Sequence, residues 1–200
     1  MINDQDIDGL AHRYVLASRR LEIGPGDCPL VGEWDTLDSH PIPSVPLTYV
    51  AKWGLERLPI EDCSYDLVFS SHAIEHIPWY HAQDALREVC RIVRPGGAFE
   101  VWTVDFAVVV EYYLSHRMVG DWDCGGRISN YMQSVSGRVF AYEKNGSPWM
   151  WHKALFDRPY LRSLLLGCGF DRVEDLRQTR GHDHGVINMG VVAFKNSLVG

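Results

Sequence analysis

A glycine-rich turn directly after a short apolar segment is the first feature of this chain that could do chemistry. Residues 20–23 read Arg-Leu-Glu-Ile, and a Gly-Pro-Gly turn follows at 24–26. Because glycine has no side chain, such a turn lets a ligand lie against the backbone, and Glu22 adds a carboxylate that can receive a cationic group. The turn is a weak signal alone. It is not the dinucleotide fingerprint, which needs a third glycine where this chain has Pro29.

Two further segments place polar residues next to a predicted strand and helix. Residues 58–76 combine a Leu-Pro turn, an apolar strand expected at 65–70 that ends in two serines, and a helix that opens with Ile-Glu-His at 74–76. Residues 86–97 carry apolar side chains at helical spacing and end in Pro-Gly-Gly, which stops a helix and turns the chain before the next strand.

Together, the three segments resemble the class I S-adenosylmethionine (SAM) dependent methyltransferases, of the type 11 kind. The resemblance covers about residues 18–105 and 152–195. Within this family, the chain is most similar to methyltransferases associated with surface-polysaccharide synthesis, which have a similarly short connection after the glycine turn. The resemblance implies an α/β fold: a three-layer Rossmann-like sandwich around a seven-stranded, mostly parallel sheet whose last strand is antiparallel.

The residue pattern supplies the elements that such a sheet needs. Strands are expected at 20–23, 34–38, 47–51, 65–70, 99–104, 170–178 and 185–195, and helices at 7–17, around 86–93, at 106–117 and at 158–166. The link between the first two strands leaves little room for the helix that usually follows the glycine turn, so we expect a single helical turn or none.

The resemblance implies that the cofactor is SAM and the product S-adenosylhomocysteine. The residues expected to line the cofactor pocket are Glu22, Ile23, Gly24, Pro25, Gly26, Asp38, Trp53, Gly54, Leu55, Ser70, Ser71 and His72. Asp38 would accept hydrogen bonds from the ribose hydroxyls, the alternative being a carboxylate that caps a loop. Trp53 would contact the adenine, the alternative being core packing. Gly54 departs from the family, which often has an acidic residue there.

An aromatic-rich insertion at about 106–157, within a single domain spanning 1–200, is the expected cover over the methyl acceptor. Thirteen of the 23 aromatic residues lie in 99–160, and aromatic side chains supply contact area and exclude water. Part of this enrichment is packing, since the expected helix at 106–117 has apolar side chains at helical spacing. A general base is needed only if the acceptor must lose a proton. The candidates for catalysis are His76, Asp105 and His152, with His72 also near.

Charge and composition restrict the remaining possibilities. A net charge of −7 makes a nucleic-acid substrate unlikely. Five scattered cysteines, an acidic N-terminus without an apolar signal core and the lack of a long apolar run favour a cytoplasmic protein with reduced thiols and no membrane span. The triplet at 182–184, His-Asp-His, is read as a polar turn rather than a metal site, and we expect no metal. The oligomeric state is left open.

We therefore expect a methyltransferase that acts on a small-molecule or sugar-like acceptor. Two alternatives remain: an oxidoreductase with a nucleotide cofactor, which the missing third glycine disfavours, and a methyltransferase-like binding subunit without turnover. The sequence does not distinguish methylation of oxygen, nitrogen or carbon.

Overall fold

A seven-stranded sheet forms the centre of the protein. The computed structural model describes residues 17–119, 128–141, 148–177 and 179–196. The strands are β1 (Arg20–Ile23), β2 (Asp35–Asp38), β3 (Tyr49–Val50), β4 (Tyr65–Ser71), β5 (Val93–Val104), β6 (Arg172–Leu176) and β7 (Asn188–Phe194). Their order is β3-β2-β1-β4-β5-β7-β6, and β7 runs antiparallel to both of its neighbours while the other pairs are parallel. The predicted sheet, with its antiparallel last strand, is confirmed.

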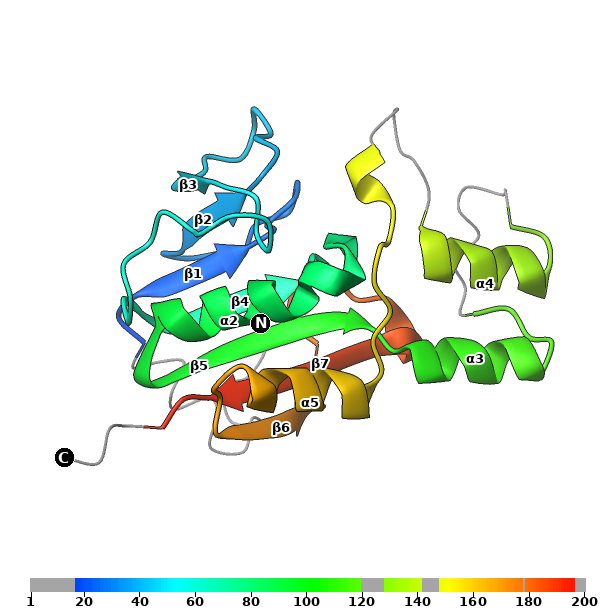
Figure 1. The fold of residues 1–200 in the computed structure, drawn as a ribbon. Coiled ribbons are helices and arrows are strands. Elements are labelled where there is room, and N and C mark those ends of the chain that lie inside the picture. The colour runs from blue at the N-terminus through cyan, green and yellow to red at the C-terminus, as the bar shows by residue number, and fades with distance from the viewer. Residues whose placement is uncertain (1–16, 120–127, 142–147, 178, 197–200) are drawn as a thin grey trace.

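The helices of the described residues fall into two groups (Figure 1). Helices α2 (Ala82–Ile92) and α5 (Arg158–Gly167) lie on one face of the sheet, whereas α3 (Phe106–Leu114) and α4 (Tyr131–Phe140) pack against each other beyond the end of β5. Four short 3₁₀ turns complete the set: η1 (Ile74–His76), η2 (Trp79–His81), η3 (Pro148–Met150) and η4 (Gly185–Ile187). The helix predicted at 7–17 lies outside the described residues except for its last position.

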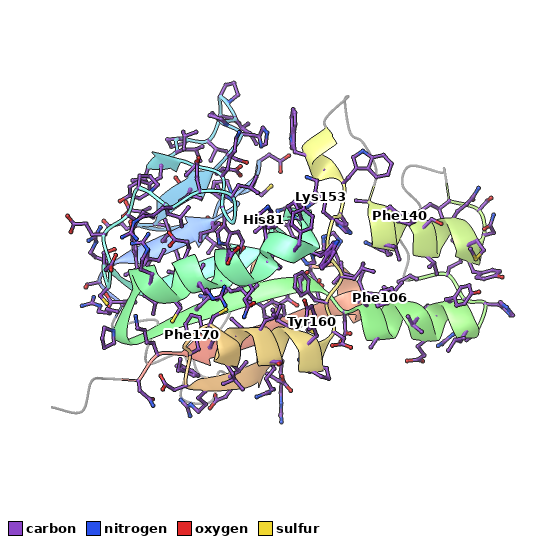
Figure 2. The ribbon with its side chains drawn as sticks, in the orientation of Figure 1. His81, Phe106, Phe140, Lys153, Tyr160 and Phe170 are labelled. Carbon is purple, nitrogen blue, oxygen red and sulfur yellow. The ribbon has the colours of Figure 1, made fainter. Side chains whose placement is uncertain are left out.

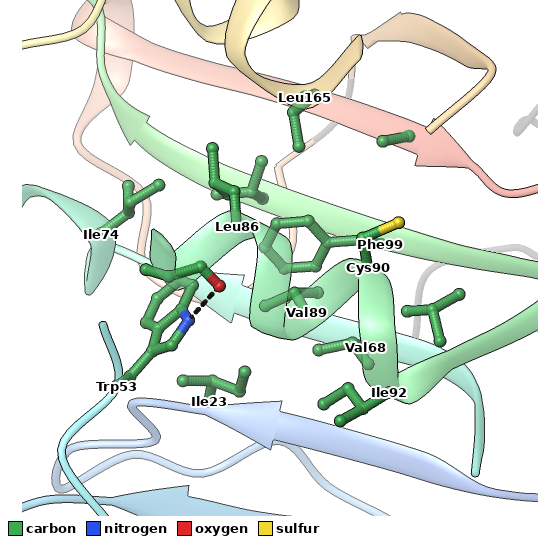
Figure 3. Close-up of a cluster of buried hydrophobic side chains, with 14 of the residues drawn as sticks. Ile23, Trp53, Val68, Ile74, Leu86, Val89, Cys90, Ile92, Phe99 and Leu165 are labelled. Carbon is green, nitrogen blue, oxygen red and sulfur yellow. Dashed lines mark hydrogen bonds between the residues drawn. The ribbon is translucent and has the colours of Figure 1, made fainter. Parts of the chain in front are cut away.

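The main core lies between the sheet and helices α2 and α5. Alternate residues of the strands point toward these helices, as the pleat requires, and meet the apolar face of α2. Figure 3 shows Leu86, Val89 and Ile92 of α2 facing this side of the sheet. The other face carries a smaller cluster that includes Leu67, Val192 and Trp34. Among the described residues, loops rather than helices cover that second face.

No helix forms between β1 and β2, where residues 24–34 consist of turns and bends. The short connection expected from the sequence is therefore confirmed. The cause is length: eleven residues must cross from the end of one parallel strand to the start of the next, and a full helix with two loops does not fit.

Two local expectations were wrong. The Pro-Gly-Gly segment does not separate a helix from a strand, because β5 already begins at Val93, which pairs with Tyr65; residues 94–97 form a bulge before pairing resumes between Leu67 and Ala98. Residues 74–76 form a 3₁₀ turn rather than the start of an α-helix. Pro78 has no backbone N–H to continue that helix, so the chain makes a second turn before α2 begins.

Gly190 is the position where the sheet has no room for a side chain. It pairs with Trp102 of the neighbouring strand, and an added Cβ would lie inside van der Waals contact of the indole ring. We predict that Gly190→Ala lowers the free energy of unfolding by about 2 kcal/mol through overpacking, measured by urea denaturation. Gly167→Ala is the matched control: its Cβ would meet only a side-chain nitrogen of Gln83 at 3.9 Å. Equal effects of the two changes would contradict the packing argument.

Candidate functional site

The sheet register brings the glycine turn and the strand ends together. Ile23 at the end of β1 lies between Leu37 of β2 and Ser70 of β4. The residues that follow these three positions therefore share one edge of the sheet, the carboxyl edge where parallel α/β sheets bind ligands. The Gly24 N–H donates to the Leu37 carbonyl at 2.9 Å, which ties the turn to β2.

The two glycines of the turn have different surroundings. Gly24 has φ +74°, and an added Cβ would lie 2.5 Å from Cβ of Ala73, so Gly24 allows the chain after β4 to pack against the turn. Gly26 has φ +55°, and its added Cβ would meet nothing within 4 Å. Open space beside a glycine backbone is what close approach of a ligand requires.

Two acidic residues flank this turn. Glu22 is buried, with 4% of its surface exposed, and burial raises the pKa of its carboxyl group even though the Leu30 N–H donates to it at 2.8 Å. One of its oxygens thus holds the loop after the turn. Asp38, at the end of β2, accepts a hydrogen bond from the His40 N–H at 3.0 Å. Asp38 thus caps this loop, as the alternative reading expected; its carboxylate is half-buried, and its role toward the ribose stays a prediction.

The segment expected to contact the adenine of the cofactor, residues 53–55, is arranged differently from the prediction. Trp53 is 8% exposed and its indole N–H donates to the Ala85 carbonyl at 2.8 Å, a bond drawn in Figure 3. Its side chain belongs to the core, so the packing alternative describes it better. Gly54, with φ +82°, lets the chain pass close to α2, because an added Cβ would lie 3.1 Å from Cβ of Ala85 in that helix and 2.9 Å from Ile77 before it. Leu55 is 53% exposed, so of the three residues predicted here it is the one whose side chain faces solvent.

At the end of β4, two buried serines have different partners. The Ser71 Oγ accepts a hydrogen bond from the His182 N–H at 3.2 Å, which joins β4 to the segment before β7. The Ser70 Oγ is buried and has no hydrogen-bond partner among the described residues.

A buried carboxylate, which the sequence analysis did not select, organises the neighbouring part of the edge. Glu75 is 2% exposed and its Oε1 lies 2.9 Å from Nδ1 of His72. Burial alone would raise the pKa of Glu75, but the charge and hydrogen bond of His72, with the charges of His76 and His152, hold it at about 2. The Glu75 carbonyl also accepts hydrogen bonds from the Lys153 and Ala154 N–H groups.

Histidines from three parts of the chain meet at this carboxylate. The His72 ring lies edge-on to His184 with centroids 4.2 Å apart, and the His76 ring lies edge-on to His152 at 5.1 Å. Arg138 of α4 reaches both pairs: its guanidinium contacts Nδ1 of His184 at 3.2 Å, and its carbonyl lies 3.1 Å from Nδ1 of His152. Burial lowers the pKa of His184 to about 4 and also lowers the pKa of His152.

The predicted catalytic residues therefore separate into two groups. His76 and His152 come together as expected, with His72 beside them. Asp105 lies apart and has a structural role: it is 7% exposed, its carboxylate caps α3 by accepting from the Ala107 N–H at 3.1 Å, and its N–H donates to the Ile187 carbonyl. Its catalytic role stays a prediction. A Ser, Thr, Asp or Asn directly before an apolar helix is the signal for such a cap.

The insertion at 106–157 contacts the loop that follows β2 and also the segment that follows β4. Trp149 of η3 stacks on His40, with ring centroids 4.3 Å apart and planes 15° from parallel, so it touches the loop that follows Asp38. The Trp79 N–H donates to the Lys153 carbonyl at 3.1 Å, and Figure 2 shows Lys153 beside His81 where the two segments meet. Trp122, also expected here, lies outside the described residues.

The residues that sequence reasoning missed are Glu75, Arg138, His184 and Asn188. For Glu75 a signal existed, because an acid beside two histidines at the end of an apolar strand is unusual. His184 had been considered only as part of a metal triplet. Within the described ranges, no group of three His, Cys, Asp or Glu side chains could hold a metal ion. None of the helices in those same ranges is long and apolar enough to cross a lipid bilayer.

We predict that Glu75→Gln lowers the free energy of unfolding by about 3 kcal/mol at pH 7, because it leaves His72 without its buried partner. The pKa of Glu75 is depressed, so its stabilising effect is complete above the ordinary value of 4.5 and is lost as the pH falls toward about 2. Urea denaturation should therefore show the gap between the two proteins narrowing below pH 4.5. Glu61→Gln, at an exposed position, is the control. A pH-independent gap would contradict this account.

Comparison with known proteins supports the same interpretation. Residues 40–101 match the methyltransferase domain family. A ubiquinone/menaquinone biosynthesis C-methyltransferase UbiE of Bartonella quintana is 41% identical over 54 residues, which are 27% of this chain and 20% of that protein. A malonyl-[acyl-carrier protein] O-methyltransferase of Methylococcus capsulatus is 38% identical over 65 residues, 32% of this chain and 22% of that one. The chain thus spans about a fifth of the length of the curated relatives that it matches.

The whole fold has counterparts among solved structures. A SAM-dependent methyltransferase of Thermotoga maritima, described as a possible histamine N-methyltransferase, superposes with a TM-score of 0.53 at 19% identity, covering 89% of this chain and 82% of that one. At this identity the likeness concerns the fold. The matched central segment and the sheet with its antiparallel last strand thus identify the chain as having the class I SAM-dependent methyltransferase architecture, as its sequence indicated.

Proposed function

We propose that this protein transfers a methyl group from SAM to a small-molecule acceptor. The observation that carries the proposal is the arrangement of the carboxyl edge: the open glycine turn and Asp38 lie at β1 and β2, and the histidine cluster lies at β4, directly after Ala73, which packs against Gly24. A cofactor held at the first group is adjacent to an acceptor held at the second.

At the cofactor end, the chain offers the groups that SAM requires. Bound SAM supplies an activated methyl group on a sulfonium, so positioning does most of the catalytic work. Gly26 leaves room for the ligand at the turn, and Asp38 offers a carboxylate to the two ribose hydroxyls. Leu55 supplies an exposed apolar side chain on the adenine side.

At the acceptor end, the insertion at 106–157 is proposed as the cover. Its described part exposes Trp149 and Trp151, at 43% and 42%. The Trp151 carbonyl contacts His76 of the histidine cluster, and Trp149 stacks on His40. Exposed indole rings beside buried imidazoles suit a small acceptor with both a ring-like surface and a polar reacting group. The sugar-like acceptor, the link to surface polysaccharides and the cytoplasmic location stay predictions. The two curated relatives methylate carbon and oxygen by name, so they do not select the atom.

Calorimetric titration with SAM, S-adenosylhomocysteine and NAD separates this proposal from its alternatives. Binding of the two sulfur ligands supports the methyltransferase, and binding of NAD alone supports an oxidoreductase. A protein that binds none of the three is a binding subunit with a methyltransferase fold. The acceptor is then sought by incubating the full chain with methyl-labelled SAM and a small-molecule extract.

We predict that Gly26→Asn lowers the affinity for S-adenosylhomocysteine about tenfold or more, the equivalent of about 1.4 kcal/mol. Asn tolerates the left-handed backbone conformation of this position, but its side chain enters the space proposed for the ligand. Gly185→Asn is a matched control, because Gly185 also has a positive φ (+66°) and open space around it. If Gly26→Asn folds and binds like wild type in the same titration, the pocket lies elsewhere.

We predict that Trp151→Ala reduces the transfer of labelled methyl groups from SAM to the small-molecule extract. The affinity for S-adenosylhomocysteine should stay within about twofold of wild type. The reason is that Trp151 belongs to the proposed acceptor cover, and its carbonyl contacts His76 at 3.3 Å. Trp79→Ala, at a 68% exposed position, is the control for loss of a surface indole. Loss of S-adenosylhomocysteine binding with unchanged affinity for the acceptor would overturn the assignment of this segment.

A further inference from the structure

Hydrogen bonds fix where the protons sit on three of the clustered histidines. A carboxylate only accepts hydrogen bonds, so His72 donates from Nδ1 to Glu75 at 2.9 Å. The other ring nitrogen of His72, Nε2, lies 2.9 Å from Oδ1 of Asn188. An amide oxygen only accepts hydrogen bonds, so Nε2 of His72 also carries a proton when the oxygen of the Asn188 amide, and not its nitrogen, faces His72.

The Asn188 amide is fixed by its own partners. Its nitrogen lies 3.2 Å from the His182 carbonyl and 3.1 Å from the Asp183 carboxylate, and both of these groups only accept. The amide nitrogen must therefore face them, which leaves the amide oxygen toward His72. His72 is consequently an imidazolium, and it pairs with the buried Glu75.

His184 has the opposite arrangement. Its Nδ1 lies 3.2 Å from the Arg138 guanidinium, which only donates. Nδ1 is therefore an acceptor, and His184 is neutral with its proton on Nε2. Its lone pair is occupied by Arg138, so His184 has none left for a substrate.

His152 alone combines a fixed tautomer with an open lone pair in the interior of the cluster. Its Nδ1 lies 3.1 Å from the Arg138 carbonyl, which only accepts, so the proton is on Nδ1 and the lone pair of the neutral ring is on Nε2. The hydrogen bond of the His152 ring among the described residues is the one at Nδ1, which leaves Nε2 unengaged. Burial lowers the pKa of His152 below its ordinary value of 6.5, which keeps the ring neutral near pH 7. His76 has a similar but longer contact, 3.3 Å, at a more exposed position.

We propose that Nε2 of His152 is the general base of the reaction, and that the acceptor is therefore a protic group, a hydroxyl or amine that reacts as it loses its proton. In this step the acceptor oxygen or nitrogen forms a bond to the methyl carbon while the carbon–sulfur bond breaks. The electron pair of that bond stays on sulfur and neutralises the sulfonium, and the acceptor proton moves to Nε2. The resulting imidazolium is stabilised by Glu75 and later releases its proton to solvent.

The groups that face His152 set the pH dependence of this step. They are the carboxylate of Glu75 and the backbone carbonyl of Arg138, which favour its protonation, and His72 and His76, which oppose it. Transfer should therefore fall as the pH drops below 6.5 and His152 becomes protonated. The proposal rests on the proposed methyl transfer, and it further restricts the acceptor to one with a dissociable proton.

Nitrogen-15 NMR of the full chain in complex with S-adenosylhomocysteine tests the proton positions without an acceptor. At pH 7.5 we expect the His152 ring to show a protonated Nδ1 and an unprotonated Nε2, and the His72 ring to show two protonated nitrogens. A protonated Nε2 on His152 would overturn the proposal. Failure of the chain to bind S-adenosylhomocysteine would instead overturn the proposed function, so the two failures are distinguishable.

The variant His152→Asn tests the same atom in turnover. Its amide can still donate to the Arg138 carbonyl, as Nδ1 does, but it has no group in place of Nε2. With methyl-labelled SAM and the small-molecule extract, we expect transfer to fall about 100-fold or more, affinity for S-adenosylhomocysteine to be retained, and the decline below pH 6.5 to disappear. The assignment would be refuted if His152→Asn transferred methyl groups at the wild-type rate. It would also be refuted if His76→Asn alone reduced the transfer rate as much as His152→Asn does.

Discussion

The buried carboxylate of Glu75 is the interaction on which the functional edge of this protein depends. Its side chain compensates the charge of His72, while its backbone carbonyl holds the chain at Lys153 and Ala154. One residue thus connects the end of β4 to the return of the insertion. A buried charge contributes when its partners are in place and costs several kcal/mol when they are not. The cluster therefore favours one arrangement of these segments over looser ones.

The parallel pairing of the strands brings together the residues that are proposed to bind the cofactor. Because Ile23 lies level with Leu37 and Ser70, the turn after β1 and the ends of β2 and β4 meet without any side chain having to direct them. Backbone pairing positions the groups proposed to bind the cofactor, whereas side-chain charge positions the groups proposed to bind the acceptor. The two halves meet where Ala73 fits against Gly24.

The sequence was sufficient for those parts of the molecule that local pattern determines. The positions of the strands and the missing helix after the glycine turn follow from the spacing of apolar runs and glycines, whereas the antiparallel last strand was implied by the resemblance to the class I methyltransferases. Pairing partners were harder to foresee: nothing local distinguishes a Pro-Gly-Gly that separates two elements from one that forms a bulge within β5. Trp53 was ambiguous for a similar reason, since its hydrogen bond goes to Ala85, 32 positions away. Arg138 and His184 reach the cluster only through tertiary packing, so no spacing rule could select them.

The stack of Trp149 on His40 gives the carboxyl edge a mechanical property. The two rings belong to separate excursions of the chain, one leaving the sheet after β2 and the other leaving it after β5, and their contact joins the two. Neither segment can move away from the other at this point unless the two rings separate. The stack therefore couples the position of the loop after Asp38 to the position of η3.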